Sequence, residues 1–174
     1  GPLCFRAAWV YGRGMNGLSL TLRDATDALT PVSATPRLDA ELLMAHALGI
    51  DRSAMLLRMH DLAVPAGFAA MLARRVADEP VAYITGMQAF WDLDLHVTPD
   101  VLIPRADSET VIEVAMAAFA GRDAPARILD LGTGSGALLL AALSVFSGAE
   151  GVGIDASAAA LAVASGNAAR LGLD

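Results

Sequence analysis

The segment Asp130–Gly136, which reads Asp-Leu-Gly-Thr-Gly-Ser-Gly, constrains the fold of this chain more than any other stretch. The apolar run 128–131 directly before it is typical of a buried strand, and the apolar run 137–147 after it predicts a helix. Glycines allow a sharp backbone turn and a close approach to a ligand. The first turn of the following helix points its N–H groups at the same place. The segment therefore predicts a ligand-binding loop at the end of a strand.

Strand and helix patterns alternate around this loop. A helix is expected from Asp107 or Ser108 to about residue 120, a second short strand over 151–155, and a helix capped by Ser157 that runs to about residue 171. This order predicts a parallel, doubly wound sheet. Such a sheet normally has five or more strands and only about two are visible, so we expect the chain to end in mid-domain.

The spacing of the glycines bears on the kind of cofactor. A dinucleotide-binding loop reads Gly-x-Gly-x-x-Gly, whereas this chain has Gly-x-Gly-x-Gly with an acid two positions upstream. That form resembles the loop of class I methyltransferases, which bind S-adenosylmethionine. Asp155 ends the next expected strand, where a carboxylate can accept both hydrogen bonds of a ribose diol. A turn with only a structural role is the alternative. The candidate cofactor-binding residues are Asp130, Gly132, Thr133, Gly134, Ser135, Gly136 and Asp155.

The residues before position 80 predict short helices. Thr35 can cap a helix that has proline at its first position, and Gly49 is placed to end that helix. Further helices are expected from about residue 53 and around 68–76. The adjacent pair Arg74 and Arg75 is interpreted as part of a solvated helix face.

The stretch 80–104 is predicted to be a β-hairpin that links two modules. Val81–Ile84 is a brief β-prone run, and the apolar residues at 93, 95 and 97 alternate with polar ones. The fold class is therefore α/β, with an N-terminal helical domain, a linking hairpin and the first part of a Rossmann-like doubly wound sheet of the class I methyltransferase type. The predicted division is a tag or unstructured segment over 1–14, a helical domain over 15–79, the hairpin over 80–104 and a partial cofactor-binding domain over 105–174.

The composition argues against several classes of function. The net charge of −7 disfavours a nucleic-acid partner, which would require a cationic surface. Cys4 is the only cysteine, which fits a reducing cytoplasm, and neither a membrane-spanning run nor a signal-peptide pattern is visible. The histidines at 46, 60 and 96 lack metal-ligand spacing, so no metal is expected.

Three blocks together resemble the release-factor glutamine methyltransferases of the HemK/PrmC type, over nearly the whole chain from about residue 20. The first block is Pro36–Leu43, near the start of the helical module. The second consists of Glu79–Gly86, Phe90-Trp91 and Val101–Glu109, and it is the most specific of the three. The third consists of Asp130–Gly136 with Asp155 and Asn167-Ala168. The chain departs from the family at Ala106 and Ser108, where proline and threonine are usual.

The resemblance implies transfer of a methyl group from S-adenosylmethionine to the side-chain amide nitrogen (N5) of the glutamine in the Gly-Gly-Gln loop of peptide chain release factors. It also implies that the N-terminal helices help to dock the release factor. The Asn-Pro-Pro-Tyr motif, which holds the substrate glutamine in the family, does not occur in these 174 residues. No catalytic residue is therefore assigned in this chain, and we expect the 174 residues alone to be inactive. Phe90, Trp91 and Arg105 are possible pocket residues, although each could instead have a packing or ion-pairing role.

Two other functions stay open from the sequence. An adenine- or RNA-directed N-methyltransferase can share the glycine loop, although the acidic charge counts against it. The chain could also be an inactive cofactor-binding fragment that is unstable or self-associates because a strand edge is exposed.

Overall fold

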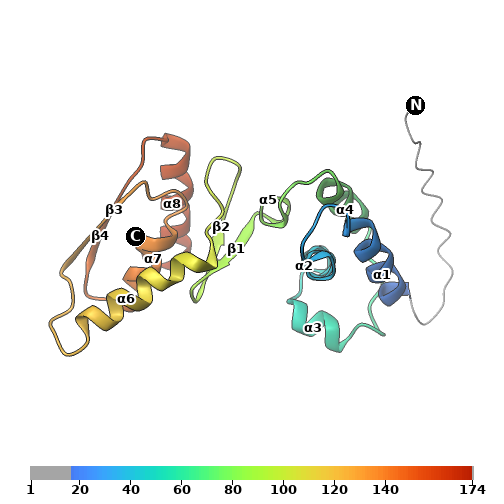
Figure 1. The fold of residues 1–174 in the computed structure, drawn as a ribbon, viewed down its shortest axis with the longest axis horizontal. Helices are drawn as coiled ribbons and strands as arrows, with labels where there is room; N and C mark the ends of the chain where they lie inside the picture. The colour runs from blue at the N-terminus through green and yellow to red at the C-terminus, as the bar shows by residue number, and fades with distance from the viewer. Residues whose placement is uncertain (1–16, 174) are drawn as a thin grey trace. The chain divides into compact units, whose positions relative to one another are not determined.

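The computed structural model describes residues 17–173, and the chain divides into two compact units between Ile84 and Thr85 (Figure 1). The predicted tag or unstructured segment over residues 1–14 lies outside the described residues. None of the described helices combines the length and apolar character needed to cross a membrane.

The first unit is built from helices. They are α1 (Gly17–Leu29), α2 (Pro36–Leu48), α3 (Arg52–Leu57), α4 (Phe68–Val76) and the short α5 (Val81–Thr85), whose last residue belongs to the second unit. Their apolar faces meet in one core, so this unit buries its own hydrophobic centre. The largest fully buried side chains in it are Leu18, Leu22, Leu29, Leu43, Met44 and Met55.

Helix α2 begins and ends where the sequence predicts, but it is not capped as expected. Gly49 follows its last turn with φ of 67°, a left-handed conformation that glycine adopts at little cost. The Thr35 side chain does not bond to the backbone of the first turn. Its hydroxyl instead donates to Asp39 Oδ1 over 3.1 Å. The cap prediction for Thr35 was therefore wrong, because Asp39 is a competing acceptor one turn along the helix.

The Arg75 side chain is largely covered within the first unit, with 11% of it exposed. Its guanidinium donates to Asp39 Oδ2 over 2.8 Å and to the Val32 carbonyl over 3.1 Å, so it joins α4 to the start of α2. The interpretation of Arg75 as part of a solvated face was wrong. The interpretation as a solvated face applies to Arg74, which pairs with Glu79 at the surface.

The β-prone run Val81–Ile84 is helical, so the strand expected there was wrong. The Pro80 carbonyl accepts from the N–H groups of Tyr83 and Ile84 over 3.0 and 3.1 Å, which closes a helical turn. Ile84 is buried in the core of the first unit. The β propensity of two branched residues is outweighed by this turn and by burial.

The second unit opens with an antiparallel hairpin of β1 (Met87–Phe90) and β2 (Leu93–His96), in which Phe90 lies opposite Leu93. Leu95 is fully buried, whereas Asp94 and His96 are exposed. The alternating pattern predicted for this strand is confirmed.

The rest of the second unit follows the predicted order of strands and helices. A short 3-10 turn leads into α6, and β3 and β4 then pair in parallel, with Leu129 opposite Val152. This order is that of part of a Rossmann-like α/β sheet, as predicted. The elements are η1 (Ala106–Ser108), α6 (Glu109–Phe119), β3 (Arg127–Leu131), α7 (Ala137–Val145), β4 (Glu150–Ile154) and α8 (Ala158–Leu171).

Helices α7 and α8 of the second unit pack on one face of the β3–β4 pair (Figure 1). Gly151 permits this packing, because a Cβ there would lie 2.7 Å from Leu143 Cδ1 of α7. On the other face the side chains at 129, 131, 152 and 154 are 60, 72, 52 and 50% exposed. The expectation of a buried strand at 128–131 was therefore wrong for the described residues, since only one of its faces is covered.

Candidate functional site

The glycine loop joins β3 to α7 and is held against the end of β4. The N–H groups of Gly132 and Thr133 both donate to the Ile154 carbonyl, over 2.7 and 3.0 Å. Gly132, Gly134 and Gly136 have φ values of 79°, 56° and 83°, in the region that favours glycine. Three left-handed residues in five positions let the chain reverse immediately after the strand.

Each strand end contributes one aspartate to the loop. Asp130 Oδ2 accepts a hydrogen bond from the Thr133 hydroxyl over 2.8 Å. Asp155 Oδ2 accepts from the Gly134 N–H, and its Oδ1 accepts from the Ser157 N–H, both over 2.9 Å. The Asp155 carboxylate therefore ties the middle of the loop to the start of α8 while staying half-exposed to ligand.

The environment of Asp155 keeps its carboxylate ionised. The backbone N–H of Ser157, and then that of Gly134, lower the pKa of this group below its usual value. Hydrogen bonds to a carboxylate favour its charged form. A charged acceptor is thus present at the loop at neutral pH.

This pKa shift predicts the pH dependence of the second unit. A lowered pKa in the folded state contributes stability above the unfolded value of about 3.9. That contribution is lost as the pH falls through the folded value. We expect Asp155→Asn to reduce the difference in melting temperature between pH 6 and pH 3, measured by circular dichroism. An unchanged difference would show that Asp155 does not couple the loop to protonation.

A cavity of about 360 Å³ lies beside the loop, within the second unit. It brings Phe90 from the hairpin and Arg105 from the segment before α6 together with the loop and Asp130, residues far apart in the sequence. Its walls thus combine an aromatic ring, a cation, a carboxylate and backbone groups. The lining residues are Phe90, Leu102, Ile103, Pro104, Arg105, Ser108, Asp130, Gly132, Thr133, Gly134, Ser135, Ala137 and Leu138.

Trp91 is not among these lining residues. It packs against the core of the second unit, and its backbone adopts φ of 58° at the hairpin turn. Its N–H donates to Glu109 Oε1 over 2.9 Å, which attaches the turn to α6. Of the three possible pocket residues, Phe90 and Arg105 line the cavity and Trp91 takes a packing position next to it.

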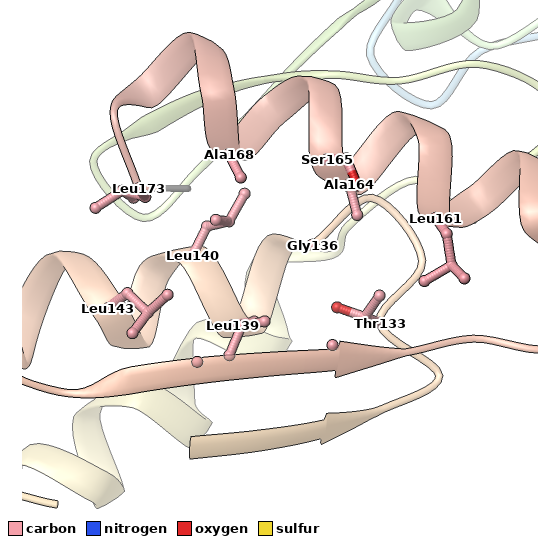
Figure 2. Close-up of a pocket in the computed structure, with 12 residues that line it drawn as sticks. Thr133, Gly136, Leu139, Leu140, Leu143, Leu161, Ala164, Ser165, Ala168 and Leu173 are labelled. Carbon is pink, nitrogen blue, oxygen red and sulfur yellow. The ribbon is translucent and has the colours of Figure 1, made fainter. Parts of the chain in front are cut away.

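A second hollow of about 270 Å³ lies between α7, α8 and β4 (Figure 2). Leu139, Leu140 and Leu143 of α7 face Leu161 and Ala164 of α8 across it. Among the described residues, its lining includes no charged side chain that would orient a charged ligand. Gly136 borders this hollow. The loop positions Gly132, Thr133, Gly134 and Ser135 line the cavity beside the loop, whereas Gly136 and Asp155 are absent from its lining.

Sequence reasoning missed several residues of the cavity wall. Leu102, Ile103 and Ser108 line it, and they belong to the block Val101–Glu109, within which only Arg105 was assigned to a pocket. Asn167 was quoted as part of a motif without a role, yet it is buried and bonded to the loop. A polar residue among the alanines of the predicted helix after Ser157 was the available signal.

Comparison with known families gives two matches along the chain. Residues 21–86 match the PrmC N-terminal domain, and residues 122–174 match a methyltransferase domain. The first match covers most of the helical unit, and the second contains the glycine loop and Asp155.

Individual relatives agree with these matches. A release factor glutamine methyltransferase of Bordetella pertussis is 49% identical over 140 residues, which are 79% of this chain and 52% of that protein. Proteins of the same name from Rhodospirillum rubrum and Escherichia coli are 45 and 39% identical, over 80 and 87% of this chain and 43 and 55% of their own lengths. The chain spans about half the length of the curated relatives it matches.

Proposed function

We propose that this chain, which is related to the release factor glutamine methyltransferases, supplies the S-adenosylmethionine site of an enzyme. The enzyme methylates N5 of the glutamine in the Gly-Gly-Gln motif of peptide chain release factors, in the cytoplasm. The observation that carries the proposal is the Asp155 carboxylate, which accepts from the N–H of Gly134 over 2.9 Å, because Gly134 itself lines the cavity of mixed chemistry.

The groups of the site suit each part of this cofactor. Asp155 is an ionised acceptor for the two ribose hydroxyls, and its backbone partners hold it in place before the ligand arrives. Phe90, only 1% exposed, borders the cavity from the core of the second unit, and the apolar residues at 102–104 would provide contacts for a flat base. Asp130, with the Thr133 hydroxyl, borders the cavity where an ammonium group would find a negative partner. When bound, the cofactor supplies a methyl group on a positively charged sulfur.

The residues of this chain bind and orient, and none is assigned as an acid or base. A side-chain amide nitrogen is a poor nucleophile, so alignment with the methyl donor and the local electrostatics would supply most of the rate. In the family that this chain resembles, an Asn-Pro-Pro-Tyr motif holds the glutamine amide, and these 174 residues lack that motif. The net charge of −7 supports a protein substrate over a nucleic acid.

The proposal is tested by expressing the complete reading frame that encodes these residues and supplying radiolabelled S-adenosylmethionine and a release factor. We expect label on the release factor, and none when the Gly-Gly-Gln glutamine is replaced by alanine. The 174-residue chain, tested in parallel, should bind the cofactor without transferring label. Label on the alanine variant, or on transfer RNA or DNA in its place, would contradict the proposed substrate.

A further inference from the structure

Asn167 is a buried polar side chain of α8 that reaches both the hairpin and the glycine loop. Its Nδ2 donates to the carbonyls of His96 and Ser135, each over 2.9 Å. Its Oδ1 accepts from the His96 N–H over 2.7 Å. The residue is only 1% exposed, so water does not replace these bonds. The side-chain amide of Asn167 therefore provides hydrogen-bond partners for backbone groups of β2 and of the glycine loop.

The loop needs such an external contact to keep one conformation. Ser135 stands between Gly134 and Gly136, and glycines leave the backbone many accessible conformations. Asn167 fixes the Ser135 carbonyl, and Asp155 fixes the N–H of Gly134, the residue directly before it. Two side chains, one directly after β4 and one in α8, thus hold adjacent residues of the loop.

The same amide also sets the position of the hairpin. His96 ends β2, and its N–H and carbonyl are both bonded to Asn167, in the manner of one more ladder pair. The paired strand β1 carries Phe90, which lines the cavity beside the loop. Asn167 therefore contacts both the hairpin that carries Phe90 and the glycine loop.

We propose that Asn167 is a positioning residue that holds the glycine loop in its cofactor-binding conformation and fixes the end of β2 beside the loop. The effect on cofactor affinity rests on the proposed function, whereas the effect on the loop itself does not. If the loop keeps its conformation in only about a tenth of the molecules without Asn167, the apparent Kd rises about tenfold.

The test compares Asn167→Ala with Val97→Ala in the 174-residue chain. Val97 is buried, follows His96 directly and lines neither cavity, so its truncation weakens the same region without touching the loop. Both variants should melt at a lower temperature. Only Asn167→Ala should raise the Kd for S-adenosylmethionine about tenfold by calorimetry. Only Asn167→Ala should also speed amide hydrogen exchange over residues 132–136 in the ligand-free protein.

Equal changes in loop exchange for the two variants would overturn the proposal, because Asn167 would then act only through stability. If the unaltered chain does not bind S-adenosylmethionine, the proposed function fails for this chain and the exchange comparison still decides the role of Asn167. If Asn167→Ala is unfolded, Asn167→Ser, which keeps one hydroxyl donor, takes its place and should show the same pattern to a smaller degree.

Discussion

Replacing Asp155 with asparagine is expected to weaken binding of S-adenosylmethionine on the order of 100-fold, since hydrogen bonds to a charged acceptor are the strong ones and a ribose diol would make two. The two carboxylate oxygens each accept one backbone N–H, from Gly134 and from Ser157. An asparagine presents one oxygen and one NH2 group, so one of those N–H groups would face a donor. The substitution therefore removes the charge and also loosens the middle of the loop.

Calorimetric titration of the Asp155→Asn variant measures this effect. The matched control is Asp123→Asn, which makes the same chemical change at an exposed carboxylate in the segment before β3. The control should bind with the affinity of the unaltered chain. If Asp155→Asn binds within threefold of the unaltered chain, the carboxylate is not part of the cofactor site.

Replacing Arg75 with methionine is expected to lower the free energy of unfolding of the helical unit by about 3 kcal/mol, because breaking a buried ion pair leaves an uncompensated charge. The side chains of Arg75 and Asp39 are each 11% exposed and are 2.8 Å apart. The substitution also leaves the Val32 carbonyl without its guanidinium donor. Urea unfolding followed by circular dichroism measures the change.

The neighbouring residue supplies the control for this measurement. Arg74 pairs with Glu79, but their side chains are 47 and 33% exposed. Surface pairs of this kind contribute little, so Arg74→Met should leave the urea midpoint nearly unchanged. Adding Asp39→Asn to Arg75→Met should recover part of the lost stability, because the stranded carboxylate is then removed. Equal effects at positions 74 and 75 would contradict the assignment of Arg75 to the interior.

The glycine loop and its surroundings could be predicted from the sequence because local rules determine them. The strand at 127–131, the loop and the helix that follows occupy adjacent positions, and positive φ is nearly confined to glycine. The helix that Ser157 caps is confirmed, with the Ser157 hydroxyl accepting from the Ala160 N–H. The residue types that predict each of these features are neighbours in the sequence, although contacts from Ile154, Asp155 and Asn167 also hold the loop in place.

The features that could not be predicted depend on tertiary contacts. Val81–Ile84 has strand propensity, but burial of Ile84 and the turn at Pro80 make it a helix. Arg75 bonds to Asp39, 36 positions earlier, and no local pattern distinguishes it from the exposed Arg74. Asn167 meets His96 across 71 positions. Residues 102–105 likewise line the cavity only after the chain has folded against the loop.

Amide hydrogen exchange of the 174-residue chain, measured with and without S-adenosylmethionine, shows whether the cavity beside the glycine loop binds this cofactor. We expect protection over residues 132–136, around Asp155 and around Phe90, with helices α1 to α4 unchanged. Absence of binding would contradict this expectation. So would protection confined to the leucine-lined hollow between α7 and α8 (Figure 2).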